Sequence, residues 1–308
     1  MNEEFVRYTL SLHHAEERVD RSIAFFSGLS RSKVAELIAN RKILRNGIPI
    51  KKGSELAQIG DVIEMPNPTS IKRVEIEPDK SIEFEVIFED DSLIVINKPS
   101  GLIVHPGSGI KDGTLINGLA ARFPDLKMLD DSIRLGLVHR LDKGTSGLVL
   151  VARTQEALTG LKSQMQEREI RRQYRAISVG HIESEKGIVD APLGRDPKNP
   201  LKRAVLRDGK HAKTHYRVEQ RLSEPFKVSV LMCQLETGRT HQIRVHLAAI
   251  GFPVIGDELY GGRKSFNLNN RLALHAETIS FRHPKKNYNL EFEAPFPEDF
   301  SLLRGLFS

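Results

Sequence analysis

The sequence predicts an α+β protein, in which a large domain with a mixed, largely antiparallel sheet follows a small α/β module. Three observations lead to this prediction. Residues 16–65 combine helical spacing of apolar residues with one hairpin turn. Residues 66–80 hold three prolines among mostly polar and charged neighbours, and residues 81–308 hold many strand-like apolar runs but few helical ones. We therefore expect two domains, 16–65 and 81–308, joined by a linker at 66–80.

The small module is expected to contain two helices and one hairpin. Ser30 is a suitable N-cap for the second helix, and Asn46-Gly47 is a strong hairpin-turn signal between two short apolar runs. Apolar residues at roughly helical spacing are Ala24, Phe25, Leu29, Val34, Leu37 and Ile38. Five cations are interleaved with this pattern, and their spacing predicts that several share one exposed helix face. They are Arg31, Lys33, Arg41, Lys42 and Arg45.

The large domain is expected to be rich in strands. Predicted strands are Glu83–Glu89, Leu93–Asn97, Leu135–His139, Gly147–Ala152, Tyr174–Val179, His215–Gln220 and Lys227–Leu235. Two helices stand out beside them. Thr154 is the expected N-cap of one that carries Leu158, Leu161 and Met165. Thr240 is the expected N-cap of another that carries Ile243, Leu247 and Ile250 and ends at Gly251 and Pro253.

Composition and charge favour a folded protein that binds a polyanion. The net charge is +6, but residues 161–221 hold 15 Lys/Arg and 8 Asp/Glu, a local charge of 15 − 8 = +7. No apolar run approaches the roughly 18 residues of a membrane span, and the acidic N-terminus is unlike a secretory signal. The single cysteine, Cys233, excludes an internal disulfide and a multi-cysteine zinc site. A cytoplasmic protein without membrane partners is expected.

The segment 139–147, His-Arg-Leu-Asp-Lys-Gly-Thr-Ser-Gly, carries the densest set of reactive side chains. It lies between two predicted strands, which places Asp142 on a short loop at the sheet ends. The spacing around Ser146 does not fit a nucleophile elbow, and Leu141 interrupts a kinase-type His-Arg-Asp. A second equivalent Asp loop, which an aspartic protease requires, is missing. An Asp that caps its own loop is the structural alternative.

Two further segments are candidates for binding. In 235–246, His241 and His246 are five residues apart, about 140° around a helix, which is poor geometry for one metal. No metal site is therefore predicted, whereas Arg239 and Arg244 suit a phosphate or a carboxylate. Segment 171–175 places a tyrosine, Tyr174, among arginines. The glycine-rich turns at 97–101 and 105–109 lack the Gly-Lys-Ser/Thr ending of a nucleotide-binding loop.

Together these segments resemble the bacterial pseudouridine synthases that modify large-subunit ribosomal RNA, the RluA family. The likeness covers roughly residues 83–295, and residues 16–65 separately resemble the S4 RNA-binding module. The combination of the two, with His-Pro-Gly-Ser-Gly at 105–109 before Gly113-Thr114, is most similar to the D-type members, whose targets lie in a stem-loop at the ribosomal subunit interface. One departure is Arg172, where the family usually has Lys. The matching segments are 96–101, 104–107, 136–142, 145–147, Tyr174 with Ala176, 236–247, 256–257 and 260–262.

The resemblance implies isomerisation of specific uridines in 23S ribosomal RNA to pseudouridine. Asp142 would be the reactive carboxylate, as a nucleophile at C1′ or a base at C2′, and Arg244 would keep it charged. Tyr174 would stack on the uracil, and Arg140 would fill the space left by a flipped-out base. The other expected substrate-binding residues are His139, Leu141, Thr145, Arg172, Arg239, His241 and Ile243.

The reaction neither oxidises nor reduces its substrate, so no cofactor and no metal are expected. The expected partner is large-subunit ribosomal RNA or a pre-ribosomal particle, and a monomer is expected. Two alternatives stay open at this stage. One is a non-catalytic RNA-binding or ribosome-assembly factor on the same scaffold. The other is a carboxylate-based glycoside hydrolase, which would need a second carboxylate across the scissile bond.

Overall fold

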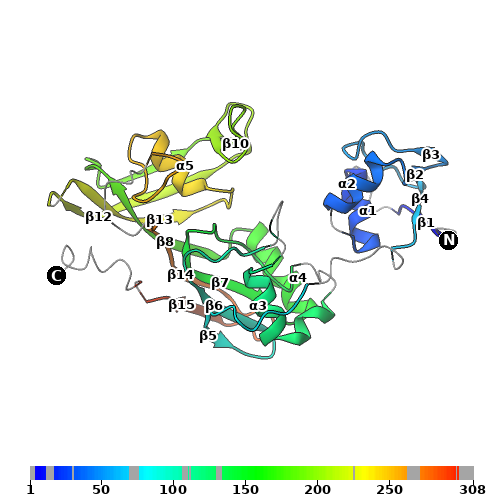
Figure 1. Cartoon of the computed structure of the whole chain (residues 1–308), viewed down its shortest axis with the longest axis horizontal. Coiled ribbons are helices and arrows are strands. Elements are labelled where there is room, and N and C mark those ends of the chain that lie inside the picture. The colour runs from blue at the N-terminus through cyan, green and yellow to red at the C-terminus, as the bar shows by residue number, and fades with distance from the viewer. Residues whose placement is uncertain are drawn as a thin grey trace. The chain divides into compact units, whose positions relative to one another are not determined.

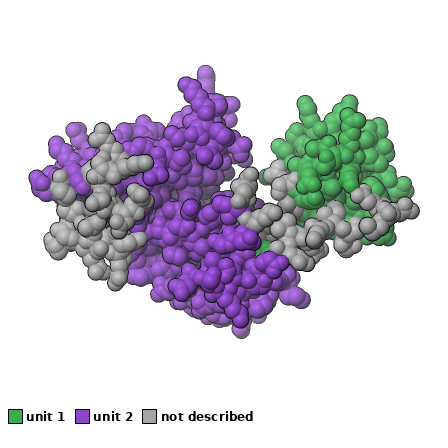
Figure 2. Space-filling model, in the orientation of Figure 1, with its two compact units in different colours: residues 1–76 green, residues 77–308 purple. Residues whose placement is uncertain are grey.

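The computed structural model describes residues 4–11, 17–29, 31–68, 76–105, 110, 112–129, 134–224, 226–261, 271–295 and 297. The chain forms two compact units, residues 1–76 and residues 77–308 (Figure 2). The strands and helices of both units are drawn in Figure 1. Among the residues described, no helix is both long enough and apolar enough to cross a membrane.

The N-terminal unit is a small α/β fold. Its elements are β1 (Phe5–Thr9), α1 (Val19–Ser27), α2 (Arg31–Ala39), β2 (Leu44–Arg45), β3 (Ile48–Pro49) and β4 (Val62–Pro66). The sheet has the order β1-β4-β2-β3. Its core contains Ile23 from α1, Val34 and Leu37 from α2, and Ile63 and Met65 from β4, all buried. Burial of this apolar face holds two helices of nine residues each that would be marginal alone.

Both predicted helices of this unit are present, and so is the predicted hairpin turn. Asn46 and Gly47 have φ of 53° and 78°, the left-handed pair that a type I′ turn requires. Strand β1 was not predicted. Phe25, which fits the helical spacing, is 80% exposed and so lies outside the core. Ser30, the predicted N-cap of α2, lies outside the described residues.

The larger unit is built on a nine-stranded sheet. Eight strands follow the order β5-β6-β7-β14-β8-β13-β12-β9, and β15 pairs with β14. All of these pairs are antiparallel except β7 with β14. The mixed, largely antiparallel sheet predicted from the sequence is therefore confirmed. The strands are β5 (Glu85–Glu89), β6 (Leu93–Lys98), β7 (Ser146–Ala152), β8 (Arg171–Val179), β9 (Lys186–Asp190), β12 (Lys213–Leu222), β13 (Val228–Leu235), β14 (Leu274–Arg282) and β15 (Asn289–Glu293).

Helices cover this sheet at two places (Figure 1). α3 (Leu115–Arg122), the 3₁₀ turn η2 (Pro124–Met128) and α4 (Gln155–Gln166) lie in the half that contains β5, β6 and β7. α5 (Gln242–Ala249) lies in the other half, with β12 and β13. A separate two-stranded hairpin, β10 (Leu193–Arg195) and β11 (Arg203–Val205), projects from that second half.

Strand β7 is buried over all seven of its residues, as is typical of a strand with both faces covered. Leu148 and Leu150 join a core cluster that also contains Leu158 and Leu161 of α4. At its start, Gly147 has φ of 107° and lies so close to β14 that a Cβ atom would collide with the Ala276 carbonyl oxygen. This close approach fixes the parallel β7–β14 pair directly beyond the loop that carries the candidate reactive carboxylate.

One predicted strand and one predicted cap were wrong. Leu135–His139 is not a strand, because Leu135 and Gly136 both have positive φ, and Leu137 makes just one isolated bridge, to Val151. Helix α5 begins at Gln242 with His241 as its N-cap, so Thr240 is not the cap. Thr154 does cap α4, since its hydroxyl oxygen accepts a hydrogen bond from the Ala157 amide at 3.1 Å.

Candidate active site

Side chains of the segment 98–101 donate hydrogen bonds to backbone carbonyl groups of the loop that carries Asp142 and so hold it in place. Lys98 is fully buried, and its Nζ donates hydrogen bonds to the carbonyl oxygens of Pro99 and Leu102 at 2.8 Å and of Lys143 at 3.3 Å. Ser100 Oγ donates to the Gly144 carbonyl at 2.8 Å. Burial lowers the pKa of Lys98 to about 7, although the negative charge of Asp142 favours the ammonium form. These hydrogen bonds fix the backbone on the C-terminal side of Asp142.

The Asp142 carboxylate lies in a chain of charges that begins in the interior. Arg244 of α5 donates from Nη1 to Asp142 Oδ2 at 3.0 Å. The same guanidinium binds Asp257 with two hydrogen bonds, from Nε at 2.7 Å and from Nη2 at 2.9 Å. Although burial opposes it, the bonds and charges of Asp257 and Asp142 raise the pKa of Arg244 above its usual value. Arg244 is therefore a fixed cation, aimed at Asp142 by a fully buried carboxylate.

His241 and Tyr260 flank this pair. His241 has φ of 60°, a left-handed conformation rare for residues other than glycine, and its Nε2 lies 3.9 Å from Asp142 Oδ2. Its Nδ1 hydrogen-bonds the Tyr260 hydroxyl at 2.9 Å. Burial lowers the pKa of His241, which favours a neutral ring that accepts at Nδ1. The Tyr260 ring also packs 5.2 Å from the guanidinium carbon of Arg244.

Strand β8 forms another wall of the site. Tyr174 and Arg172 project from it and are 4% and 8% exposed. Burial raises the pKa of Tyr174, so the phenol stays protonated near neutral pH. Nε of Arg172 has no hydrogen-bond partner among the described residues. A buried guanidinium that is incompletely satisfied in the free protein is a candidate for contact with a ligand.

All eleven residues predicted for the large-domain site line one cavity of 510 Å³. The three predicted as catalytic are Asp142, Tyr174 and Arg244, and the eight predicted to bind substrate are His139, Arg140, Leu141, Thr145, Arg172, Arg239, His241 and Ile243. They come from the 138–145 loop, β8, the 235–241 turn and α5, which are far apart in the sequence. The structure therefore brings the sequence-predicted set together in one place.

His139 and Arg140, although adjacent, differ in burial. Burial, and then the charge of Arg172, lower the pKa of His139 to about 3. Its ring is therefore neutral, and its Nε2 accepts a hydrogen bond from the Leu150 amide at 3.2 Å. This contact ties the loop to β7. Arg140 is exposed at the edge of the cavity and so is accessible to a large ligand.

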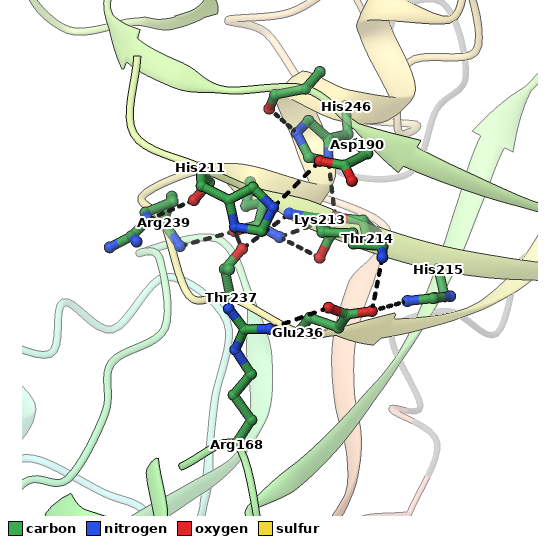
Figure 3. Close-up of polar contacts among 12 residues, drawn as sticks. Arg168, Asp190, His211, Lys213, Thr214, His215, Glu236, Thr237, Arg239 and His246 are labelled. Atoms are coloured by element: carbon green, nitrogen blue, oxygen red, sulfur yellow. Dashed lines mark hydrogen bonds and ion pairs between the residues drawn. The ribbon is translucent and has the colours of Figure 1, made fainter. Parts of the chain in front are cut away.

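Glu236 and Arg168, to which the sequence motifs assign no individual role, also line the cavity. They belong to a polar cluster around Glu236 (Figure 3). The Glu236 carboxylate contacts His215 Nε2 at 2.5 Å, Lys213 Nζ at 3.4 Å and Arg168 Nη1 at 3.4 Å. Hydrogen bonding to His215 and the neighbouring cations lower its pKa below the usual range. Arg168 follows α4, whereas Glu236 follows β13, so this ion pair joins two walls of the cavity.

A buried hydrogen-bond network supports the turn between β13 and α5. Gln242 accepts from the Thr237 hydroxyl at 2.7 Å and from the Arg239 amide at 3.0 Å, and donates to the Thr214 hydroxyl at 3.0 Å. Thr214 in turn contacts His246 Nδ1 at 2.8 Å. The sequence pattern does not predict the two pairs that involve Thr214, because their members are 28 and 32 residues apart.

Several of the five cations predicted for RNA binding by the N-terminal unit were expected to share one helix face, but only two of the five lie on a helix, so that expectation was wrong. Their binding to RNA stays a prediction. Arg31 and Lys33 lie on α2, where Lys33 is paired with Glu36 at 2.7 Å, and the Arg31 side chain lies outside the described residues. Arg41, Lys42 and Arg45 follow the end of the helix. Arg45 is largely buried and paired with Asp61 and Glu55, which indicates a structural contribution.

Comparison with known proteins identifies the scaffold. The family model for RNA pseudouridylate synthase matches residues 92–249. The uncharacterized RNA pseudouridine synthase YlyB of Bacillus subtilis (strain 168) is 40% identical over 298 residues, covering 96% of this chain and 95% of the relative. Ribosomal large subunit pseudouridine synthase D of Escherichia coli (strain K12) is 39% identical over 305 residues, covering 94% and 90%.

A solved structure, that of human RNA Pseudouridylate Synthase Domain Containing 1, superimposes with a TM-score of 0.58 at 28% identity, covering 73% of this chain and 89% of the human chain. The family predicted from the sequence motifs is thereby confirmed. The chain belongs to the RNA pseudouridylate synthase family.

Proposed function

We propose that this protein isomerises specific uridines of large-subunit (23S) ribosomal RNA to pseudouridine, with Asp142 as the reactive carboxylate. The observation that carries the proposal is the carboxylate of Asp142 in the cavity, 3.0 Å from an arginine that Asp257 holds from the interior. The name of the Escherichia coli relative, a ribosomal large subunit pseudouridine synthase, supports large-subunit RNA as the substrate.

The reaction is an isomerisation, so all atoms of the nucleotide are conserved. The N1–C1′ bond breaks, the uracil turns, a C5–C1′ bond forms, and the proton on C5 is replaced by one on N1. Asp142 either attacks C1′ and carries the sugar as an ester, or removes the C2′ proton and later returns it. Both routes need an ionised carboxylate, and the guanidinium of Arg244 donates a hydrogen bond to this carboxylate at 3.0 Å.

The remaining wall residues would hold the uracil while it is detached. The buried ring of Tyr174 offers a stacking surface, and such stacking contributes about 1–3 kcal/mol per base. Leu141 and Ile243, both 4% exposed, supply apolar contacts beside it. A nucleotide must leave its helix to reach Asp142, at a cost of a few kcal/mol, and the exposed Arg140 is suited to occupy the vacated space.

The N-terminal unit would act as an S4-like RNA-binding module. Two helices against a small sheet, with exposed Arg41 and half-buried Lys42 after the second helix, support this assignment. Removal of residues 1–66 is expected to raise KM on full-length ribosomal RNA more than it lowers kcat, because the described residues that line the Asp142 cavity all lie between positions 138 and 274. An unchanged kcat/KM would contradict the assignment.

The proposal is tested by incubating the purified protein with an unmodified 23S ribosomal RNA transcript and mapping pseudouridine in the product. Pseudouridine at discrete positions is the expected result. RNA binding without pseudouridine would favour a non-catalytic assembly factor. Release of free uracil would indicate hydrolysis instead, and either outcome would overturn the proposal.

A further inference from the structure

A second cavity adjoins the one that holds Asp142. It has a volume of 590 Å³ and lies between the β10–β11 hairpin and the turn 238–240. The hairpin projects from the larger unit and is the most prominent extension of its second half (Figures 1 and 2). The cavity is lined by Leu193, Gly194, Arg195, Arg203, Leu206, Asp208, Gly209, Lys210, Gly238, Arg239 and Thr240.

The lining of this second cavity carries uncompensated positive charge. It contains four cations, Arg195, Arg203, Lys210 and Arg239, against one carboxylate, that of Asp208, a balance of 4 − 1 = +3. None of the four forms an ion pair with any residue that the structure describes. The cations around Glu236, by contrast, are gathered on a carboxylate (Figure 3). A concave surface lined by several unpaired cations favours an anionic ligand.

The position of the second cavity identifies what anion it would receive. Gly238, Arg239 and Thr240 line both cavities, so a single turn of chain separates them. Arg239 itself is oriented by a hydrogen bond from its Nε to the His211 carbonyl at 3.0 Å, which leaves its two terminal nitrogens for other contacts. An RNA strand with one nucleotide in the first cavity could therefore cross the turn 238–240 and place the neighbouring phosphate in the second cavity.

The hairpin is also tied directly to the Asp142 site. The Arg203 amide of β11 donates a hydrogen bond to the Tyr260 hydroxyl at 2.7 Å, and that hydroxyl contacts His241 Nδ1 at 2.9 Å. A Cβ atom on Gly209 would approach the Leu193 backbone to 2.8 Å, so the base of the hairpin is closely packed. These contacts fix the distance between the second cavity and the reactive carboxylate.

We propose that the second cavity binds the phosphodiester group next to the uridine held at Asp142. This assignment rests on the proposed function. Arginine suits the role because its planar fork matches phosphate geometry, and both Arg195 and Arg203 extend from the hairpin. Binding a flanking phosphate there would hold the flipped nucleotide in register with Asp142 without reading its base.

The test uses a matched pair of double variants. Arg195→Gln with Arg203→Gln removes two cations from the cavity lining, and Lys198→Gln with Arg207→Gln removes two exposed cations of the same hairpin region that do not line it. Each variant is assayed with a short synthetic RNA that contains a uridine mapped in the 23S experiment. Neutral methylphosphonates replace, one at a time, the phosphates on its 5′ and 3′ sides.

With the wild-type protein, one of the two methylphosphonates is expected to raise Kd about tenfold, the size of one charge-assisted hydrogen bond. The cavity variant should bind the unmodified RNA about tenfold more weakly and show no further weakening on that substitution. For this variant, the slope of log K for RNA binding against log salt concentration should be smaller in magnitude by about 0.7 for each phosphate that is no longer neutralised. The Lys198/Arg207 control should keep the full methylphosphonate penalty.

A cavity variant that retains the tenfold penalty would overturn the assignment, and so would a control variant that loses it. Thermal melts of both variants check that the hairpin substitutions leave the fold intact. Formation of pseudouridine by the wild-type protein distinguishes a failure of the phosphate subsite from a failure of the proposed function. If pseudouridine forms but neither methylphosphonate weakens binding, the subsite is wrong and the proposed function stands. If no pseudouridine forms, the proposed function is wrong.

Discussion

Arg244 and Arg172 line the same cavity and are almost equally buried, at 7% and 8% exposure. Arg244 makes three hydrogen bonds to two carboxylates, whereas Arg172 forms no ion pair with the described residues and its Nε has no partner there. Removing one partner of a buried ion pair is strongly destabilising, and a buried charge that has no partner itself costs stability. We infer that the side of the cavity formed by α5, which carries Arg244, positions Asp142. The side formed by β8, which carries Arg172, is available to bind a ligand.

The largest effect is expected from Arg244→Met. The change leaves the Asp257 carboxylate, which has no exposed side-chain surface, without its counter-ion, and breaking a buried pair this way costs roughly 3–5 kcal/mol of unfolding free energy. Urea denaturation measures the loss. Pseudouridine formation should fall with it, because Asp142 is also deprived of its cation. A stability within about 1 kcal/mol of the wild type would contradict the assigned role of this wall.

A smaller effect is expected from Asp257→Asn, which keeps the shape of the interior partner but removes its charge. Hydrogen bonds to charged groups contribute about 1.5–3 kcal/mol, so a loss in this range is expected. Since Asp257 acts through Arg244, kcat should fall by about tenfold to a hundredfold while KM changes little. A variant whose KM rises at unchanged kcat would show that Asp257 contacts the RNA instead.

Arg172→Gln should behave in the opposite way. Removing a buried guanidinium that lacks an ion-pair partner among the described residues should leave stability unchanged or raise it by about 1 kcal/mol. RNA affinity should fall about tenfold, because the variant cannot donate a charged hydrogen bond to the substrate. Equal destabilisation by Arg172→Gln and Arg244→Met would remove the distinction between the two walls.

The smallest effect on activity is expected at Asp90, a paired carboxylate outside the cavity. Although burial opposes it, hydrogen bonds from His283 and the backbone, and from Lys286, lower the pKa of Asp90 to about 2. Since the folded-state pKa lies below the ordinary 3.8, this carboxylate stabilises the protein above that pH, and the contribution is lost as pH falls toward 2. Asp90→Asn should therefore lower urea resistance at pH 6 but not near pH 2, with activity unchanged. A stability difference between Asp90→Asn and the wild type that persists at pH 2 would argue against stabilisation by the ionised Asp90 carboxylate.

Local patterns in the sequence predicted a substantial part of the fold. The β7 run, the Thr154 cap and the Asn46-Gly47 turn follow from neighbouring residues alone, and the structure contains all three. The β10–β11 hairpin escaped prediction because its strands are three residues each, too short to show an alternating pattern. The apolar run 135–139 reads as a strand, but Leu135 adopts φ of 44°, which no strand contains.

The candidate site was predictable where its residues form contiguous motifs and not where they meet through space. Asp142, Tyr174 and Arg244 lie in recognisable segments. The support behind them does not, since Arg203 reaches Tyr260 across 57 positions and Lys98 reaches Lys143 across 45. Such partners are set by the packing of the sheet, and no local spacing rule encodes them.

The most direct test of the account is a single-turnover assay of Asp142→Asn beside the wild type, with RNA affinity measured on the same samples. The side chain keeps its size but cannot act as a carboxylate nucleophile or base. We expect pseudouridine formation to fall by about 10⁴-fold or more while Kd for the RNA stays nearly unchanged. Pseudouridine formation at the wild-type rate would contradict the assignment of the chemistry to Asp142.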